Sequence, residues 1–210
     1  PFLIKDMDAA INRIQLSIEN EEGIMVFGDY DVDGTTSVTL VTSYLKDKIS
    51  NLRPYIPDRY LEGYGISKKG IKEAHANKIT LIIALDCGIK AIEQVNYAKE
   101  LGIDFIICDH HLPDKEIPKA VAVLDPKRTD CSYPFKDLCG CGIGFKLIQA
   151  LNNKLGLHDS ELITYLDLVS IAIAADIVPI IGENRALTFF GIKQMQEYPR
   201  PGLQFFLKHL

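Results

Sequence analysis

The sequence lacks several features that would place it at once in a functional class. It has no excess of basic residues, because its formal net charge is −5 at pH 7. A chain that holds nucleic acid by charge alone carries positive charge, so the composition gives no sign of a polyanionic partner. Bound divalent cations would offset much of the charge of any metal-binding acids, so an anionic substrate is not excluded.

No stretch of the sequence is typical of a membrane span. The most apolar one, residues 162–181, contains Asp167, Asp176 and Pro179. A span needs about 20 predominantly apolar residues, so a buried helix followed by an exit is the better interpretation. We expect a cytoplasmic protein without membrane association.

The cysteines form no CxxC pair, and their number, five, is odd. Cys139 and Cys141 form a CxC without a second pair, which is a poor zinc half-site. Cys87 and Cys108 lie in or beside apolar runs and are predicted to be buried thiols. This usage is typical of a reducing compartment.

Internal repeats and low-complexity tracts are also absent, and what remains is an alternation of apolar runs with helical patterns. Strands are predicted at 23–29, 52–57, 80–88, 103–111 and 120–126. Helices are predicted at 6–22, where Gly23 would end the helix, after Gly34, at 67–77, 89–102, 142–155 and 160–175, and as a last pair beyond residue 185. Continuous apolar strands that alternate with helices predict an α/β fold, with a mostly parallel sheet flanked by helices and a helical C-terminal segment.

Three of the predicted strands end in acidic residues. Asp29, Asp31 and Asp33 follow the first strand in the sequence "VFGDYDVDGTT", Asp86 follows "LIIAL" and Asp109 follows "FIIC". Ligands of open α/β sheets bind outside the carboxyl ends of the strands, so these side chains should converge although they are far apart in sequence.

Two histidines and one more acid join this set. His110 and His111 follow Asp109 directly, and Asp176 ends an almost wholly apolar helix. Carboxylates that repel one another become mutually useful around a divalent cation, and Asp with His suits Mn²⁺, Mg²⁺ or Zn²⁺. More than four converging ligands indicate two ions, about 3.5–4 Å apart, of the kind used in phosphoester hydrolysis.

Two other motifs compete for residues 29–34. An EF-hand calcium loop needs Glu at its twelfth position, where this chain has Leu40, and is excluded. "DVDGT" also matches the nucleophile motif of haloacid-dehalogenase-type phosphatases, with Asp31 as nucleophile and Asp33 as acid and base. That family has apolar residues up to the nucleophile, whereas Gly28 to Tyr30 interrupt the run here. It stays open as an alternative.

"GCGIG", residues 140–144, has the wrong spacing for a dinucleotide loop and is predicted to serve close helix packing.

With "DYDVDG", "LDCG", "CDHH" and "AADIVP" in this order, the chain resembles the DHH phosphoesterase superfamily, and its fold is expected to be the Rossmann-like fold of that family. "YIPDRYLEGYGIS", "CDHHLP" and "ENRALTFFGI" are similar to the superfamily's single-strand-specific 5′-to-3′ exonucleases. The resemblance covers nearly the whole chain. It implies hydrolysis of single-stranded DNA to mononucleotides in DNA repair and recombination.

The resemblance implies the ligands of two Mn²⁺ or Mg²⁺ ions. Asp31 and Asp33 would each hold one ion, Asp86 would bridge both, and His110 and Asp176 would complete the shell of the second.

The resemblance also implies roles around this shell, with one departure. His111 would contact the scissile phosphate, polarising it or assisting the leaving group, and Asp109 would orient the histidines. Many members of the superfamily have a histidine where this chain has Phe27. Either Asp29 compensates as a ligand of the first ion, or that ion binds weakly.

The basic residues of the predicted active-site loops are candidates for contacts with substrate. Arg59 and Arg185 could each clamp a phosphate. Weaker candidates for contacts with the DNA backbone and bases are Lys127, Arg128, Tyr60 and Tyr64. A surface charge, a structural ion pair or loop packing is an equally good interpretation of each.

Residues 1–155 are expected to form the catalytic domain. Residues 156–210 are expected to form a helical extension that contributes Asp176 and leads to a second domain outside this chain. The partners expected are single-stranded DNA and a single-strand-binding protein or helicase. Two alternatives stay open: a DHH-type enzyme acting on small nucleotides or pyrophosphate, and a degenerate family member that binds DNA or a replication protein as a scaffold.

Overall fold

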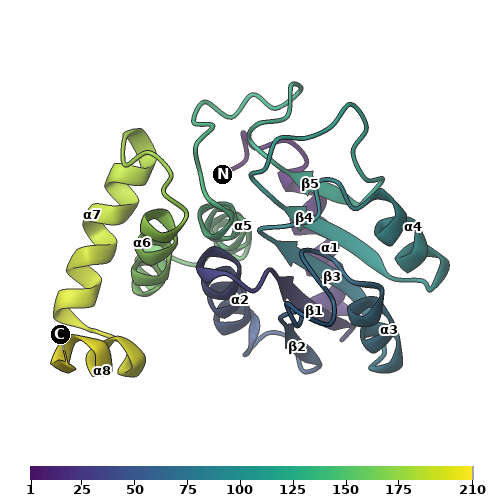
Figure 1. Ribbon diagram of the computed structural model, residues 1–210, viewed down its shortest axis with the longest axis horizontal. Coiled ribbons are helices and arrows are strands. Elements are labelled where there is room, and N and C mark those ends of the chain that lie inside the picture. Colours follow the sequence, from purple (N-terminus) through teal and green to yellow (C-terminus); the bar gives the residue numbers. More distant parts are fainter. Residues whose placement is uncertain (210) are drawn as a thin grey trace.

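A computed structural model describes residues 1–209, apart from the side chain of Leu207. Its centre is a five-stranded sheet of order β2-β1-β3-β4-β5, in which every pair is parallel (Figure 1). The strands are β1 (Gly23–Gly28), β2 (Leu52–Tyr55), β3 (Ile79–Leu85), β4 (Asp104–Cys108) and β5 (Ala122–Leu124). The central strands are buried on both faces, which explains their continuous apolar sequences. The predicted fold class is confirmed.

Helices cover both faces of this sheet. One face carries α1 (Met7–Glu19), α2 (Val32–Leu45) and α5 (Gly140–Lys154), whose apolar side chains share one hydrophobic cluster. The other face carries α3 (Lys68–Ala76), which Ser67 caps, and α4 (Ile92–Glu100), and these belong to a second cluster. Each face is therefore a separate core.

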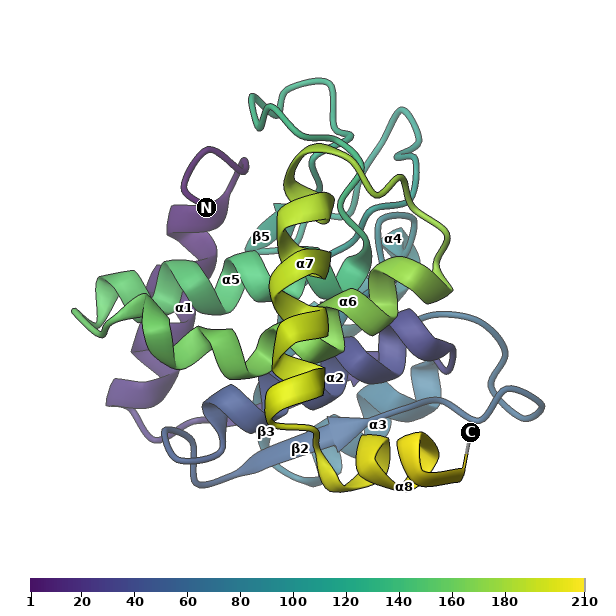
Figure 2. The same cartoon turned by 90° about the vertical axis from the view of Figure 1, so that its left-hand side faces the viewer.

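The chain ends in a helical segment stacked on the first face. It comprises a 3₁₀ helix (Asp159–Tyr165), α6 (Leu166–Ala175), α7 (Gly182–Glu197) and α8 (Pro201–His209). α6 packs against α2 and α5, and α7 crosses α6 on the outside (Figure 2). Val169 and Ile173 of α6 join the core cluster of the first face. The division of the chain at residue 155 stays a prediction.

Several predicted boundaries are wrong. The first helix ends at Glu19, the chain turns at Glu21 with φ 54°, and Gly23 begins β1 instead of ending the helix. A Cβ at Gly23 would lie 2.9 Å from the backbone oxygen of Lys78, so close packing requires this glycine. α2 begins at Val32, before Gly34, because the Asp31 carboxylate caps its first turn.

The boundaries of the C-terminal helices also differ. α5 begins at Gly140, two residues early, and residues 159–165 form a 3₁₀ helix where an α-helix was predicted. α7 begins at Gly182, ahead of the predicted start.

All five cysteines are buried free thiols, as the sequence predicts for Cys87 and Cys108. Within residues 1–209, no helix combines the length and apolar character that a membrane span requires.

Candidate active site

The acidic residues meet where the order of the sheet reverses. β1 is followed in sequence by β2 on one side and by β3 on the other, so the crevice outside their carboxyl ends is the expected ligand site of such a sheet. Residues 29–33 leave β1 there, Asp86 follows β3, and residues 109–111 follow β4.

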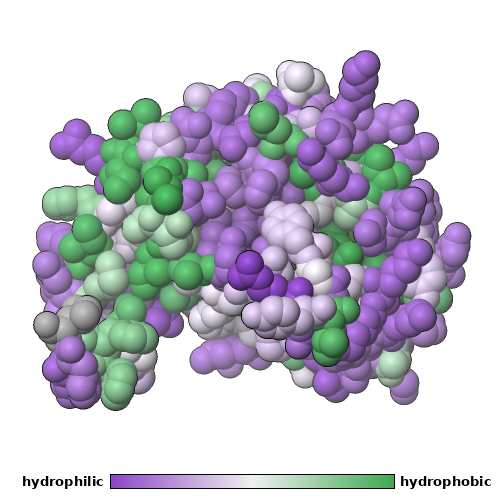
Figure 3. Space-filling model, in the orientation of Figure 1, coloured by the Kyte–Doolittle hydropathy of each residue, from purple (hydrophilic) through white to green (hydrophobic). Residues whose placement is uncertain are grey.

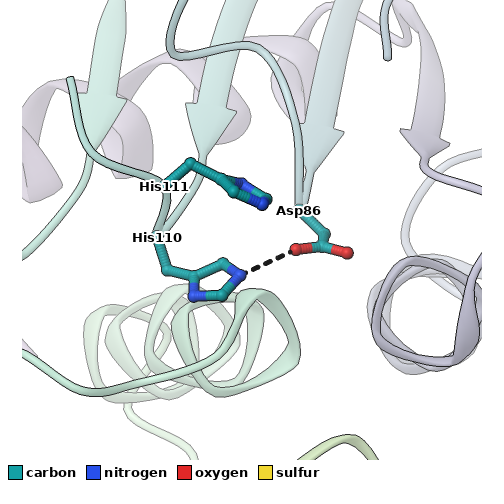
Figure 4. Close-up of side chains that lie close together, drawn as sticks. All are labelled: Asp86, His110 and His111. Carbon is teal, nitrogen blue, oxygen red and sulfur yellow. Dashed lines mark ion pairs between the residues drawn. The ribbon is translucent and has the colours of Figure 1, made fainter. Parts of the chain in front are cut away.

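One imidazole nitrogen lies among three carboxylates. His110 Nε2 is 3.1 Å from Asp86 Oδ1, 3.6 Å from Asp176 Oδ2 and 3.8 Å from Asp33 Oδ2. Figure 4 shows His110 and His111 after one strand and Asp86 after its neighbour, with the two rings and the carboxylate facing one another. The four groups come from α2 and from the residues that follow β3, β4 and α6, so the predicted convergence of these four is confirmed.

Backbone donors from α5 hold the Asp33 carboxylate. The N–H groups of Gly140 and Cys141 donate to its two oxygens at 2.6 and 2.7 Å. A Cβ at Gly140 would lie 2.6 Å from Cβ of Asp86, so only glycine fits between the two acids. The predicted close packing of "GCGIG" is confirmed, but the sequence did not reveal that this helix N-terminus binds an acid of the site.

The cluster contains buried polar atoms that protein groups leave unsatisfied. Among the described residues, Asp86 Oδ1 and both ring nitrogens of His110 are buried and form no hydrogen bond, although His110 Nε2 and Asp86 Oδ1 approach within 3.1 Å as an ion pair. Such atoms are rare in folded proteins and require an explanation such as an ion. Two groups, Asp33–His110–Asp176 and Asp86–His110–His111, each bring their ligand atoms within 4.8 Å of one another. Oxygen and imidazole donors suit Mn²⁺ or Mg²⁺, so the residues present fit a divalent metal.

The same crowding perturbs protonation. Burial, and then the charges of Asp33 and Asp31, raise the pKa of Asp86 to about 11. Burial raises the pKa of Asp33 to about 6, and burial followed by the charge of His111 lowers the pKa of His110 to about 4. The metal-free cluster therefore retains a proton at neutral pH, which a bound cation would displace.

Asp109 lies behind the histidines and orients one of them. Its Oδ1 accepts from His111 Nδ1 at 2.7 Å and from the backbone N–H of His110 at 2.8 Å, and its Oδ2 accepts from Ile89 N–H at 2.8 Å. The hydrogen bond to Asp109 raises the pKa of His111. Burial would raise the pKa of Asp109, but the hydrogen bond and charge of His111 outweigh it and lower that pKa.

The remaining predicted ligands lie beside the cluster. Asp31 Oδ1 accepts from Gly34 N–H at 2.8 Å as the cap of α2, and its charge raises the pKa of Asp86, Asp29 and Asp176. Asp29 is buried, and burial raises its pKa. Neither belongs to the two ligand groups of the described residues. Phe27 is buried, stacks on Tyr55 at a ring distance of 5.1 Å and offers no ligand atom.

The arginines considered for contacts with substrate lie in different surroundings. The exposed Arg59 guanidinium lies over the Tyr30 ring at 5.1 Å. Arg185 is exposed in the first turn of α7, beside a shallow apolar hollow. Within the described residues, neither Arg59 nor Arg185 forms an ion pair with the acidic cluster. The substrate contact considered for Arg128 is wrong, because its buried guanidinium pairs with Asp6 and Asp130 at 2.6 and 2.8 Å.

Sequence analysis missed one buried acid at the carboxyl ends of the strands. Asp125 follows β5 as Asp109 follows β4, its Oδ1 accepts from Lys127 N–H at 2.7 Å, and its Oδ2 is buried without a partner among the described residues. Burial raises its pKa to about 6. The signal was available, since "VLDP" has the same apolar run followed by an acid as the other strands.

Comparison with known proteins identifies the family. The model of the DHH family, N-terminal domain, matches residues 23–173. The chain belongs to the DHH family. This decides against the haloacid-dehalogenase alternative, in which Asp31 would be a nucleophile, and the Asp31 carboxylate caps α2 instead.

The DHH chain is similar to named exonucleases over nearly its full length. It is 41% identical to the single-stranded-DNA-specific exonuclease RecJ of Bacillus subtilis, over 99% of this chain and 26% of that protein. It is 34% identical to RecJ of Escherichia coli, over 98% of this chain and 37% of that protein. The chain thus spans about a quarter to somewhat over a third of these relatives.

Two solved structures have the same fold and hold metal. A crystal structure of exonuclease RecJ bound to manganese matches 98% of this DHH chain and 52% of that chain, with a TM-score of 0.88 and 30% identity. RecJ of Thermus thermophilus in complex with Mn²⁺ matches 98% of this chain and 29% of that chain, with a TM-score of 0.83 and 27% identity.

Proposed function

We propose that this chain is the catalytic part of a two-metal-dependent phosphodiesterase, a 5′-to-3′ exonuclease that hydrolyses single-stranded DNA to mononucleotides in DNA repair and recombination. The observation that carries the proposal is His110 Nε2 within 3.1–3.8 Å of three carboxylates at the switch point of the sheet. The names of the relatives, and the manganese in their structures, support the substrate and the metal. The 5′-to-3′ direction rests on family resemblance.

The metal ligands we propose are Asp31, Asp33, Asp86, His110 and Asp176. Asp29 would be a further ligand of the first ion. Two Mn²⁺ or Mg²⁺ ions would supply Lewis acidity and an activated water nucleophile when bound. The backbone donors on Asp33 and the buried position of Asp86 fix these carboxylates in place before an ion arrives.

We assign His111 and Asp109 to the substrate side. Asp109 holds Nδ1 of His111, and Nε2, which lies 3.4 Å from the Tyr64 hydroxyl, would contact the scissile phosphate. Hydrolysis joins a water oxygen to phosphorus, breaks the bond from phosphorus to the 3′-oxygen and leaves a proton on that oxygen. The raised pKa of His111 favours the imidazolium, which can donate this proton.

Two further parts of the proposal concern the rest of the substrate and the rest of the protein. Arg59, held over Tyr30, would bind a DNA phosphate, and Arg185 would bind one farther along the strand. Residues 156–210 would lead to a second domain, which the exposed apolar side chains Ile181, Phe189 and Phe190 support. A cytoplasmic location, and a single-strand-binding protein or helicase as partner, remain predictions.

The test uses single-stranded DNA labelled at either end, with Mn²⁺, with Mg²⁺ and with chelator, beside the Asp86→Ala variant. We expect metal-dependent release of mononucleotides from the 5′ end, and none from the variant. Release from the 3′ end would contradict the polarity, and undiminished activity of Asp86→Ala would contradict the site. A ladder of oligonucleotide lengths separates this function from the small-nucleotide alternative, which predicts activity confined to the shortest substrates.

A further inference from the structure

A buried asparagine joins two backbone segments that lead to the acidic cluster. Asn184, in the first turn of α7, is 0% exposed. Its Nδ2 donates to the backbone oxygen of Asp137 at 2.7 Å and to that of Pro179 at 3.0 Å. An amide nitrogen carries two hydrogens, so both are used, and they bind two segments that are distant in sequence.

Each of these segments leads to a proposed metal ligand. Asp137 comes three residues before Gly140, whose N–H donates to the Asp33 carboxylate at 2.6 Å. Pro179 comes three residues after Asp176. One side chain therefore ties together the backbone that supports Asp33 and the backbone that follows Asp176.

The first turn of α7 is a fixed base for this amide. Oε2 of Glu183 accepts from the Tyr133 hydroxyl at 2.6 Å, and its Oε1 pairs with the buried ammonium of Lys146 on α5. Residues 177–181 have less support, because their three isoleucines are each more than half exposed. Within the part of the chain that the structure describes, the one side-chain hydrogen bond to this segment comes from Asn184.

We infer that Asn184 is a positioning residue for one of the two ions. It holds the two segments at the spacing that Asp33 and Asp176 need to share an ion with His110. The inference rests on the proposed function, because it takes that ion from it. The second ligand group has only His110 in common with the first, and Asn184 contacts neither segment that carries its other members. Loss of the amide should therefore weaken one ion and spare the other, whereas general loosening of the fold would weaken both.

The test replaces the amide by a group of the same shape that cannot donate. Asn184→Asp places an ionised carboxylate, which only accepts hydrogen bonds, against two carbonyl oxygens. Asn184→Ala removes the amide without adding charge. Leu187→Ala is the matched control, because it removes a core side chain of the same helix, 8% exposed, that forms no hydrogen bond. Thermal melting with chelator measures the stability of all three variants.

Calorimetric titration with Mn²⁺ measures the affinity of each ion. We expect two ions in the unsubstituted chain and a loss of about 10–100-fold in the affinity of one of them in Asn184→Asp, the usual effect of removing a group that orients metal ligands. Asn184→Ala should weaken the same ion, and Leu187→Ala should lower the melting temperature without changing either affinity. Cleavage of single-stranded DNA by Asn184→Asp should be slow at the Mn²⁺ concentration that saturates the unsubstituted chain and should recover at higher Mn²⁺.

The possible failures are distinguishable. Unchanged affinity for both ions in the Asn184 variants, equal weakening of both ions, or the same loss in Leu187→Ala would overturn the inference while the proposed function stands. Failure of both Asn184 variants to fold would also overturn it, because the amide would then support the whole fold instead of one ion. No binding of Mn²⁺ by the unsubstituted chain would contradict the proposed function itself, and the inference with it.

Discussion

At the scale of the residue, three acids tolerate close approach because each is fixed by a different part of the fold. Asp33 is held by backbone donors, Asp86 is buried at a strand end, and Asp176 follows a buried helix. Burial, followed by the charges of neighbouring acids, raises the pKa of all three. A divalent cation relieves this repulsion, so binding of metal and loss of protons are coupled.

His111 should affect rate without affecting metal. We expect His111→Ala to bind Mn²⁺ as the unsubstituted chain does and to lose about 10²–10⁴-fold in kcat, which is the usual contribution of a positioned proton donor. Calorimetry and single-turnover cleavage measure the two effects separately. Loss of metal binding in this variant would show that His111 is a ligand and contradict the role assigned to it.

The Asp109–His111 pair should set the alkaline limb of the pH–rate profile. Because the hydrogen bond to Asp109 raises the pKa of His111, activity that needs the imidazolium falls as pH rises through that value. Asp109→Asn removes the carboxylate that raises the pKa of His111. The loss of activity with rising pH should therefore begin at lower pH, while kcat at acidic pH changes less. An unmoved limb would mean that another group carries the proton.

The stability of the metal-free protein should fall as pH rises. The folded-state pKa values of Asp33 and Asp86, about 6 and about 11, lie above the ~3.9 of an unfolded Asp, so the folded state keeps protons that the unfolded state releases. This stability is complete below ~3.9 and is lost as pH rises through each folded pKa. The pKa of His110 is lowered to about 4, so below ~6.5 this group makes stability rise with pH and opposes the two acids. The fall in stability that the acids cause is therefore best measured above ~6.5.

The measurement is thermal unfolding between about pH 7 and 9, with chelator and with Mg²⁺. We expect the free energy of unfolding with chelator to fall by on the order of 1 kcal/mol per pH unit, and the slope to disappear in Asp86→Asn and with saturating Mg²⁺. The same slope in Asp86→Asn would show that its source lies outside the cluster.

At the scale of the element, the start of α5 fixes the spacing between two acids. A Cβ at Gly140 would lie 2.6 Å from Cβ of Asp86, whereas a Cβ at Gly142 would meet Leu138 Cδ2 at 3.3 Å, a flexible neighbour. We expect Gly140→Ala to weaken metal binding by about tenfold or more and to lower the free energy of unfolding by about 1–3 kcal/mol. Gly142→Ala is the matched control on the same turn, and equal effects of the two would contradict this account.

Elements were predictable to different degrees. The strands could be predicted because their burial on both faces leaves continuous apolar runs, and the convergence of their terminal acids followed from a parallel sheet. The start of α2 was predictable in principle, because Asp31 is a local N-cap that accepts from Gly34. The start of α5 was not, because Gly140 donates to Asp33, which is 107 residues away. Arg128 was misjudged for the same reason, since its partner Asp6 is 122 residues away.

At the scale of the whole molecule, one end carries the chemistry and another carries exposed apolar surface. Hydrophobic side chains gather at the left of the view in Figure 3, over the region of α7. Ile180 and Ile181, just before α7, and Phe189 and Phe190, on α7, are each at least half exposed. Patches of this kind mark interaction sites. The RecJ relatives that this chain matches are much longer than the chain itself.

The most direct test of the central claim, that the acids and His110 hold two catalytic ions, is a calorimetric titration with Mn²⁺. It compares the unsubstituted chain with Asp86→Asn and with Asp8→Asn, which removes the same charge from an exposed position on α1. We predict two ions for the unsubstituted chain and for Asp8→Asn, with release of protons, and severe loss of binding in Asp86→Asn. Two ions bound with unchanged affinity by Asp86→Asn would contradict the account.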